Sequence, residues 1–415
     1  MLEDFFVVPA AARRVRSCAL GAHLDAFCAR LSGLGYPPAT IRYKLWVVET
    51  LARSMTAAHV AVADLDDGYV REFVAARRRR GRTWWGFRKT VSQLTEQLRT
   101  TGVLRASEPA RESTPAAALL ARYEEYLRQE RALSESTLTR HRPFVQGFIA
   151  ERCCSTDVAR LDRVGVQDVR EFLLGRIRRL APSSGLSMGT ALRSFLRFLF
   201  LHGETGMDLS LAVPTVRQWR LSTVPKYMAA QDVERLLRSC DRSSITGRRD
   251  RAILLLLARL GLRAGEIVAL EIGDLRWREG EIIVRGKGLV RDRLPLLPDV
   301  GEALARYLRK GRPPGNSRRV FLCRQAPYRV FSSHQAVSSI VRRALARAGL
   351  APAKRGAHLL RHSLATGMLR RGASLAEIGQ VLRHRSRNTT EIYSKVDFGA
   401  LRSVTLPWPT TGRAR

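Results

Sequence analysis

Two stretches rich in helix-breaking residues divide this chain of 415 residues into three blocks. The first stretch, TTGVLRASEPARESTP, runs from Thr100 to Pro115, and the second, PTVRQWRLSTVPKYM, runs from Pro214 to Met228. Proline, glycine and serine at this density interrupt helices and strands, so we expect both stretches to be linkers. A chain of this length can hold two or three domains, each with its own apolar core.

The sequence pattern gives each block an expected extent and role. We expect the following organisation: residues 1–105 an extra N-terminal helical module, residues 115–205 a second helical module, residues 206–227 a linker, residues 228–400 a large C-terminal block, and residues 401–415 a C-terminal tail.

The first two blocks are helical in pattern and share short words. VREF at Val70–Phe73 recurs as VREF at Val169–Phe172, 99 positions later, and PATIRY near Thr40 is matched by ESTLTR near Thr137, 97 positions later. Near-constant spacing is typical of a duplicated module, which would make residues 1–105 a copy of the second module. The alternative is that two unrelated helical bundles share these words by accident, and the words alone do not decide between the two.

The C-terminal block mixes helices with a short sheet. Amphipathic segments such as QDVERLLRSC, RRDRAILLLLARLG, AGEIVALEIGDL and SSHQAVSSIVRRALARAG predict helices, and GEIIVRGKGLVRDRLPLL predicts a β-hairpin around a Gly-Lys-Gly turn. Ser374 and Glu377 form a capping-box pattern, and Asn388 is placed to cap a helix that carries Tyr393. The expected fold class is therefore mainly α with a small β-sheet.

The positive charge of the chain is spread along its whole length. Lysine and arginine number 72 against 37 acidic residues, which gives a net charge of +35. A folded basic protein most often binds nucleic acid, because neutralised phosphates release counterions. A GC-rich genome could explain why only seven of the basic residues are lysine, but it does not explain a two-to-one excess of basic over acidic residues. Between Arg77 and Lys89, we expect the rings of Trp84, Trp85 and Phe87 to be core and the arginines to face DNA.

Several classes of protein are disfavoured. No run approaches 18 apolar residues, and the N-terminus lacks the apolar segment of a secretory signal, so we expect neither a membrane span nor secretion. The six cysteines include the adjacent pair Cys153 and Cys154 but no C-x-x-C motif. We therefore expect reduced thiols in the cytoplasm, and neither a disulfide framework nor a zinc site.

Two short runs in the C-terminal block carry residues suited to chemistry on an anion. HLLRHSLATG places His358 and Arg361 three positions apart, on one face of a predicted helix, and RHRSRNTTEIYSKV places Tyr393 nine positions after His384. Arg263, in LGLRAGEI, lies where one helix ends and the next begins, so backbone amides and a guanidinium can meet an anion there. A hydroxyl, imidazoles and guanidiniums fit an anionic substrate attacked by an oxygen nucleophile without a metal, although each of these motifs alone is common in an arginine-rich chain.

Lys287 and His362 are interpreted differently from these residues. Lys287 sits between two glycines at the predicted hairpin tip, and a lysine, unlike an arginine, can give up a proton in a reaction cycle. An ordinary turn lysine is the alternative. We expect His362 to be structural.

Taken in order, these motifs make the C-terminal block similar to the tyrosine recombinases, also called the phage integrase family. LGLRAGEI resembles the arginine box of that family, VRGKG its hairpin lysine, HLLRHSLAT its second box and LRHRSRNTTEIY its terminal box. The spacings agree: 24 positions from Arg263 to Lys287, three from His358 to Arg361 and nine from His384 to Tyr393. The resemblance covers residues 228–400, and residues 115–205 resemble the helical, SAM-like core-binding domain of the family.

The sequence departs from the family at two places. Arg383 stands where many members have glycine before the histidine, a departure that concerns the geometry of the local helix end and not the chemistry. Residues 1–105 exceed the usual length of the family.

The resemblance implies roles for the nucleophile and the phosphate-binding residues. Tyr393 would attack the scissile phosphodiester, form a 3′-phosphotyrosyl bond and release a 5′-hydroxyl. Arg263 and Arg361 would hold the non-bridging oxygens and neutralise the charge that grows in the transition state.

The remaining roles implied by the resemblance concern protons. Lys287 would protonate the departing 5′-oxygen, His358 would accept the tyrosine proton or bind the phosphate, and His384 would donate a hydrogen bond to the phosphate. The covalent intermediate keeps the bond energy, so neither ATP nor a metal nor any other cofactor is expected.

The resemblance implies a site-specific DNA recombinase or integrase of a phage or another mobile element. Its expected partners are duplex recombination sites, three further protomers in a tetramer on two sites, and accessory recombinases or DNA-bending proteins, in the bacterial cytoplasm with the nucleoid. The segment from Ser394 to Pro407 is expected to form a short helix, which in this family often docks on a neighbouring protomer. The alternatives are a catalytically silent DNA-binding relative, a type IB topoisomerase and a metal-dependent nuclease.

Overall fold

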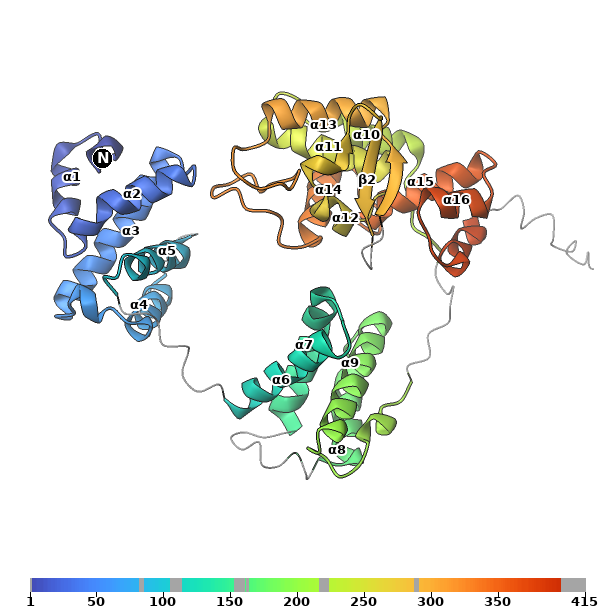
Figure 1. Ribbon diagram of the computed structural model, residues 1–415, viewed down its shortest axis with the longest axis horizontal. Coiled ribbons are helices and arrows are strands. Elements are labelled where there is room, and N and C mark those ends of the chain that lie inside the picture. Colours follow the sequence, from blue (N-terminus) through green and yellow to red (C-terminus); the bar gives the residue numbers. More distant parts are fainter. Residues whose placement is uncertain are drawn as a thin grey trace, which may run out of the picture. The chain divides into compact units, whose positions relative to one another are not determined.

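The structure is a computed structural model that describes residues 2–81, 86–104, 114–152, 161, 164–215, 224–286 and 291–396. Its elements are drawn along the chain in Figure 1. Contacts between residues divide the chain into two compact units, one formed by residues 106–222 and the other by residues 1–105 together with residues 223–415. The hydrophobic residues form separate cores, which are described in turn.

The first 104 residues form a helical module around one apolar core. Its helices are α1 (Pro9–Arg16), α2 (Leu24–Gly33), α3 (Pro38–Ala57), α4 (Asp67–Arg79) and α5 (Phe87–Thr100), with short 3₁₀ turns at Glu3–Phe5, Gly21–His23 and Val62–Asp64. Proline at the first position of α1 and α3 and the Asp66 side chain at the start of α4 mark where these helices begin. Phe87 is 1% exposed, as expected for a core ring, whereas Trp84 and Trp85 lie outside the described residues.

Residues 114–215 form a second helical module. Its helices are α6 (Pro115–Gln129), α7 (Glu135–Arg152), α8 (Val166–Ile177) and α9 (Pro182–Leu201), followed by a 3₁₀ turn at Leu209–Ala212. The core is rich in aromatic rings, with Tyr123 edge-on to Phe195 at 5.2 Å and Phe148 edge-on to Phe172 at 5.1 Å. Such edge-to-face pairs add to the hydrophobic stabilisation of the bundle.

The C-terminal block surrounds one helix that is buried on nearly all sides. That helix, α11 (Ile245–Arg259), is fully apolar from Ala252 to Leu257, and each of these six side chains is at most 1% exposed. Around it lie α10 (Ala230–Arg238), α12 (Ala264–Ala269), α13 (Pro298–Lys310), α14 (Gln335–Arg347) and α15 (His358–Arg370), followed by α16 (Leu375–Val381) and the 3₁₀ turns Arg387–Thr389 and Glu391–Val396. An apolar helix surface of this kind requires cover from several directions.

The sheet of this block has three antiparallel strands in the order β1 (Leu275–Arg276), β2 (Glu281–Arg285) and β3 (Arg291–Pro295). Strands β2 and β3 pair from Glu281 opposite Pro295 to Arg285 opposite Arg291, so the expected hairpin is confirmed. The expected fold class, mainly α with a small sheet, is confirmed as well.

Two details differ from the sequence expectation. The helix expected from Ala264 to Leu275 ends at Ala269, because Leu270 is extended and its carbonyl accepts a hydrogen bond from the Val320 amide at 2.9 Å. The capping role expected for Asn388 is wrong: Asn388 lies inside the 3₁₀ turn Arg387–Thr389, and Tyr393 lies on the next 3₁₀ turn. The Ser374 and Glu377 capping box is confirmed, with the Glu377 amide donating to the Ser374 hydroxyl at 3.2 Å.

Among the residues that the structure describes, no helix has the length and hydrophobicity needed to cross a membrane.

Gly261 and Gly280 offer a matched test of local packing, because both have positive φ values, +58° and +65°. A Cβ on Gly261 would lie 2.7 Å from Leu382 and 3.0 Å from Leu364, whereas a Cβ on Gly280 would meet nothing within 4 Å. We expect Gly280→Ala to cost about 1 kcal/mol from the left-handed backbone alone and Gly261→Ala about 2–4 kcal/mol, because leucines must also move. Denaturant titration of both variants measures the difference, and equal losses would contradict the packing at Gly261.

Candidate active site

Arg263 lies at the N-cap of α12 and is held by one carboxylate. Its backbone N–H donates to Glu266 Oε2 at 2.8 Å, and its guanidinium donates to Glu266 Oε1 at 2.8 Å. Glu266 is buried, while the Arg263 side chain is 40% exposed. Burial alone would raise the pKa of the Glu266 carboxyl, but Arg383 and Arg263 outweigh burial and hold that pKa below its usual range. Glu266 therefore stays ionised and orients an accessible guanidinium.

Arg361 is buried in the middle of the site, 3% exposed, on the first turn of α15. Its two terminal nitrogens donate to the carbonyls of Gly261 and Leu382, which belong to the turns before Arg263 and before His384. Burial and the neighbouring guanidiniums of Arg263 and Arg383 lower the pKa of Arg361 to about 10, so it stays charged at neutral pH. One side chain thus connects α15 with the segments that carry Arg263 and His384.

His358 begins α15 and is exposed, with its ring 6.2 Å from the ring of His362. Partial loss of hydration within the site, together with the charges of Arg361 and Arg263, lowers the pKa of His358. The imidazole is therefore biased toward the neutral form near other positive groups. A neutral imidazole can either accept or donate a proton, which is what a proton-transfer role requires.

His384 follows the C-terminus of α16 and is half-buried. Its Nδ1 lies 2.8 Å from the Thr390 hydroxyl, and Thr390 is 3% exposed. Burial and the charges of Arg361, Arg263 and Arg383 lower the pKa of His384 to about 4. The ring is neutral at physiological pH, and the contact with Thr390 fixes its orientation.

Arg383 ends α16 in the left-handed conformation, with φ +55°. The amide of Arg383 donates to Gln380 and that of His384 to Gly379, which is the Schellman hydrogen-bond pattern that favours glycine at this position. The family glycine is therefore explained by backbone geometry. An arginine here costs about 1–2 kcal/mol of strain that other interactions must offset.

The Arg383 side chain supplies such interactions. It is 6% exposed, and its guanidinium lies 2.7 Å from Glu266 and 3.7 Å from Asp292 on β3. Glu266 therefore bridges Arg263 and Arg383, and Arg383 also reaches Asp292 near the turn end of the β2–β3 hairpin. The helix thus ends in a Schellman motif with arginine at the left-handed position, and the Arg383 side chain connects this end to α12 and β3.

Tyr393 is 1% exposed, and its hydroxyl lies 2.9 Å from His362 Nδ1. Burial raises the pKa of Tyr393 to about 12, against a lowering effect of Arg361, while burial, His358 and Arg361 lower the pKa of His362 to about 4. His362, expected to be only structural, thus contacts the hydroxyl of the predicted nucleophile. Its spacing of four residues from His358 on one helix was the signal that could have identified it.

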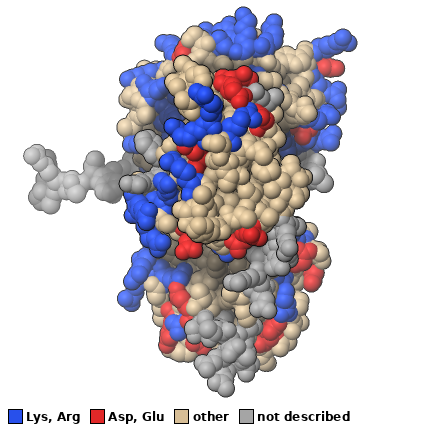
Figure 2. All heavy atoms as spheres, turned by 90° about the vertical axis from the view of Figure 1, so that its left-hand side faces the viewer, with Lys and Arg blue, Asp and Glu red and all other residues tan. Residues whose placement is uncertain are grey.

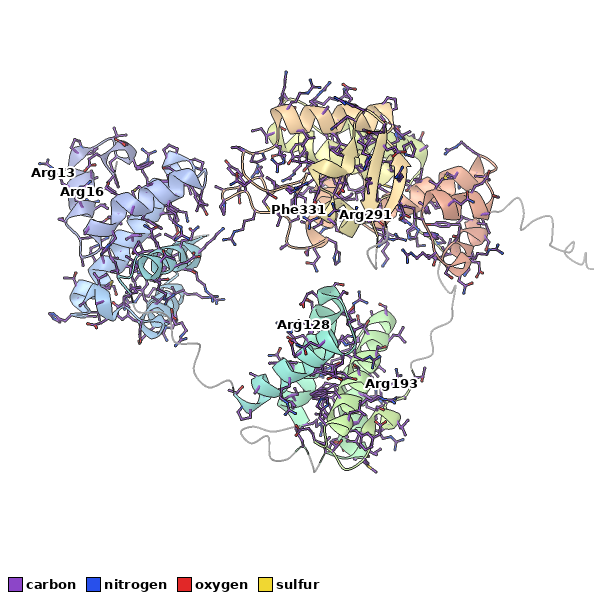
Figure 3. All side chains as sticks on the ribbon, viewed as in Figure 1. Arg13, Arg16, Arg128, Arg193, Arg291 and Phe331 are labelled. Atoms are coloured by element: carbon purple, nitrogen blue, oxygen red, sulfur yellow. The ribbon has the colours of Figure 1, made fainter. Side chains whose placement is uncertain are left out.

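Lys287 lies outside the described residues, as do the three residues that follow it. The strands on either side are described, and β3 starts at Arg291, labelled in Figure 3. Strand β3, close to the turn of the hairpin, is joined to the site through Asp292 and Arg383.

The structure therefore brings together Arg263, Arg361 and His384 through shared contacts, and Tyr393 reaches the same helix as Arg361 through His362. Three guanidiniums, of Arg263, Arg361 and Arg383, are accompanied by one buried carboxylate, Glu266. Such a site attracts an anion with several oxygens and can offer it forked N–H donors.

The two histidines with strongly lowered pKa values make stability depend on pH. The unfolded chain binds a proton at each near pH 6.5, whereas folded His362 and His384 do so only near pH 4. Stability is therefore complete above about pH 6.5 and falls as the pH drops toward 4, by up to roughly 1.4 kcal/mol per pH unit for each histidine. Denaturant titrations from pH 7 to pH 4 should show this fall and a smaller slope for His384→Asn; an unchanged slope in the variant would contradict the lowered pKa.

Two family models match the chain. Residues 226–399 match the phage integrase family, and residues 120–203 match the phage integrase N-terminal SAM-like domain. The first match contains every residue of the site described above.

Relatives and solved structures agree with these matches. The chain is 47% identical over 287 residues to a Sinorhizobium fredii protein named as integrase/recombinase y4rA, covering 69% of this chain and 70% of that one. It is 34% identical to integrase/recombinase y4rF of the same organism over 99% of this chain and 96% of the relative. The fold is similar to that of the XerH site-specific recombinase bound to its palindromic difH substrate, with a TM-score of 0.53, 22% identity, and coverage of 68% of this chain and 83% of that one. The chain belongs to the phage integrase family of tyrosine recombinases, the enzymes of site-specific DNA cleavage and rejoining.

Proposed function

We propose that the chain recombines duplex DNA through a 3′-phosphotyrosyl intermediate, with Arg263, Lys287, His358, Arg361, His384 and Tyr393 as its catalytic residues. The observation that carries this proposal is the pair of hydrogen bonds from buried Arg361 to the turns before Arg263 and His384, beside the contact of Tyr393 with His362. Residues far apart in sequence thus share one cationic site suited to a phosphodiester.

The two arginines have complementary properties for holding the phosphate. Arg263 is 40% exposed and oriented by Glu266, so it can meet the substrate without rearranging its own support. Arg361 uses one N–H of each terminal nitrogen on a backbone carbonyl and keeps a second N–H on each. Guanidiniums fixed before the substrate arrives stabilise the growing negative charge without reorganising during the reaction.

In this structure the Tyr393 hydroxyl is held in a contact with His362. Transfer of the Tyr393 proton to His362 is unfavourable, because burial raises the pKa of Tyr393 and lowers that of His362. The hydroxyl therefore stays protonated while it contacts His362. Attack requires Tyr393 to exchange this contact for the scissile phosphate, where the arginines favour the phenolate and His358 can accept the proton.

His384 suits a hydrogen bond to a non-bridging oxygen. The neutral ring carries one N–H, and a Thr390 hydroxyl that donates to Nδ1 would keep this N–H on Nε2. A neutral donor adds a hydrogen bond at a site where the arginines already supply the positive charge.

Lys287 is proposed as the general acid for the 5′-oxygen. The proposal is supported by the family pattern and by the hairpin, whose strand β3 is tied to Arg383 through Asp292. A lysine can lose its proton at a moderate cost, whereas arginine remains charged throughout.

The wider organisation is proposed from the family and from charge. Basic side chains form broad patches among fewer acidic ones on the face drawn in Figure 2, as expected of a surface that meets DNA phosphates. Residues 115–205 and 228–400 would bind one duplex site, and four protomers would assemble on two sites of a phage or other mobile element. Exchange of strands between two duplexes distinguishes this function from the relaxation of supercoils by a topoisomerase, and the complete residue set argues against a silent relative.

Replacing the nucleophile gives the first functional prediction. Tyr393→Phe removes the attacking oxygen and leaves the arginine cluster intact, so we expect no covalent protein–DNA adduct but nearly unchanged binding. The measurement uses a nicked suicide duplex built on the attachment site that flanks the encoding gene, with denaturing electrophoresis for the adduct. An adduct at another residue would reject Tyr393 as the nucleophile.

Lys287 can be tested by separating charge from proton donation. Lys287→Arg keeps the charge but cannot donate a proton at a useful rate, so we expect cleavage to fall on the order of 10²-fold or more. A substrate with sulfur in place of the bridging 5′-oxygen leaves as a thiolate, which needs no proton. It should restore cleavage by Lys287→Arg but not by Arg263→Ala or Arg361→Ala. If all three variants fail equally on the sulfur substrate, Lys287 is a phosphate ligand and not the acid.

A further inference from the structure

The two helical modules share a helix pair with matching side chains. VREF lies on α4 in the first module and on α8 in the second, and both phenylalanines are buried, Phe73 at 7% and Phe172 at 1%. The arginine four positions later lies over each ring, Arg77 at 5.8 Å and Arg176 at 4.7 Å. This shared arrangement favours duplication over accidental similarity of short words.

Each module also has a groove beside this helix pair. The groove of the first module lies between α3 and α4 and has a volume of about 710 Å³, and the groove of the second lies between α7 and α8 and has a volume of about 450 Å³. At the 99-residue spacing the same five positions line both: Glu72, Phe73, Ala76, Arg77 and Arg80 in the first, and Glu171, Phe172, Gly175, Arg176 and Arg179 in the second. The two grooves are therefore equivalent features of one helical scaffold.

Ion pairs cross the groove of the second module. Glu151 on α7 pairs with Arg176 on α8, and Arg152 on α7 pairs with Glu171 on α8 at 3.0 Å. The Arg176 guanidinium lies close against α7 because Gly147 leaves room for it: a Cβ on Gly147 would lie 2.8 Å from that guanidinium. The charges of this groove are thus largely matched within the module.

In the first module, α3 carries no charged residue at the positions that correspond to Glu151 and Arg152 on α7 of the second module. At the 97-residue spacing, Ser54 stands in place of Glu151, Met55 in place of Arg152, and Thr50 in place of Gly147. The Ser54 hydroxyl forms a hydrogen bond with the Tyr69 hydroxyl at 2.9 Å, and it brings no charge to the groove. Among its lining residues the one carboxylate is Glu72, against the three arginines Arg53, Arg77 and Arg80. Outside the lining, Glu49 on α3 lies 3.9 Å from the Arg53 guanidinium.

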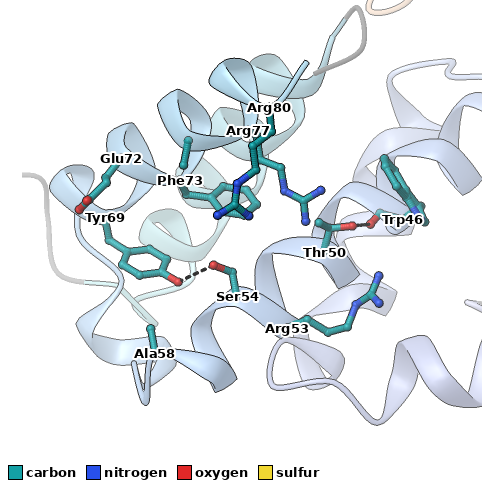
Figure 4. A pocket seen from close by; sticks show the side chains of 11 residues that line it. Trp46, Thr50, Arg53, Ser54, Ala58, Tyr69, Glu72, Phe73, Arg77 and Arg80 are labelled. Atoms are coloured by element: carbon teal, nitrogen blue, oxygen red, sulfur yellow. Dashed lines mark hydrogen bonds between the residues drawn. The ribbon is translucent and has the colours of Figure 1, made fainter. Parts of the chain in front are cut away.

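The positive groups of this groove come from both helices. Figure 4 shows Arg53 on α3 and Arg77 at α4 extending into the space between the two helices, with Arg80 nearby and Trp46 at one end. The Arg53 side chain is 66% exposed, and Trp46 is 38% exposed. Guanidiniums beside an exposed aromatic surface can meet the phosphate and the apolar face of a sugar at the same time.

We propose that the α3–α4 groove of the N-terminal module binds the backbone phosphodiester of duplex DNA, as a contact additional to the catalytic site. The proposal rests on the proposed function, because it assumes that DNA is the polyanion this chain meets. An acidic protein segment offers similar charge, but the chain carries +35 overall and the groove departs from its copy by losing a carboxylate. The high net charge and the excess of arginine in the groove favour the phosphodiester backbone of DNA as its ligand.

The test compares charge removed inside the groove with equal charge removed outside it. Arg53→Gln with Arg80→Gln alters the groove, whereas Arg42→Gln with Arg79→Gln removes two exposed arginines from the same region without touching the groove lining. With full-length protein and a mixed-sequence duplex of about 60 base pairs, we expect the groove pair to lower affinity roughly tenfold and the salt slope by about 1–2, and the control pair to change affinity less than about threefold.

A second pair of variants tests whether a carboxylate at the position of Glu151 weakens DNA binding by the first module. Ser54→Glu reintroduces a carboxylate where the second module has Glu151, so it should weaken duplex binding as the arginine removal does, while Ser54→Gln should not. Equal effects of the groove and control pairs, or of the glutamate and glutamine variants, would overturn the groove assignment. Loss of binding to poly-L-glutamate with duplex binding intact would show that the partner is an acidic protein.

The catalytic proposal and the groove proposal can be rejected independently of each other. The covalent adduct of Tyr393 on a suicide duplex reports the catalytic proposal, and it should form in the groove variants at saturating protein. Groove variants with normal duplex affinity and salt slope would reject the groove and leave the adduct untouched. Absence of the adduct in the parent protein would reject the catalytic proposal, whatever the duplex affinities.

Discussion

The buried guanidinium of Arg361 is the interaction on which the site depends. It donates to the carbonyls of Gly261 and Leu382, so the turn that leads into Arg263 and the turn that leads into His384 are fixed to α15. A buried charge is costly unless its hydrogen bonds are made, and here both terminal nitrogens have partners. Gly261 completes the arrangement, because a side chain there would meet Leu382 and Leu364.

The charges around Arg361 determine the state of the other groups. Glu266 is the buried carboxylate between Arg263 and Arg383, and it compensates only part of their charge. The remaining positive potential, together with burial, keeps His384 neutral and favours an anion in the site. Burial also raises the pKa of Tyr393, so its hydroxyl stays protonated. The attraction of an anion and the protonated state of the Tyr393 hydroxyl thus arise from one environment.

The two helical modules have similar helix pairs whose grooves carry different charges. Their aromatic packing is retained at Phe73 and Phe172, where substitution would open a cavity in the core. Their grooves differ at solvent-facing positions such as Ser54 and Glu151, where a change of charge costs the fold little. Packing therefore preserves the helix pair, while the charge pattern between the helices is free to change.

The sequence by itself determined the hairpin, the fold class and the family, because local periodicity and fixed spacings carry that information. It also predicted Arg263, Arg361, His384 and Tyr393 as site residues. It did not reveal the contact of His362 with Tyr393, which joins residues 31 positions apart. Nor did it show that Arg383 adopts a left-handed backbone and pairs with Glu266. Hydrogen bonds, burial and the pKa values that follow from them depend on which turns meet in space, and only the tertiary structure decides that.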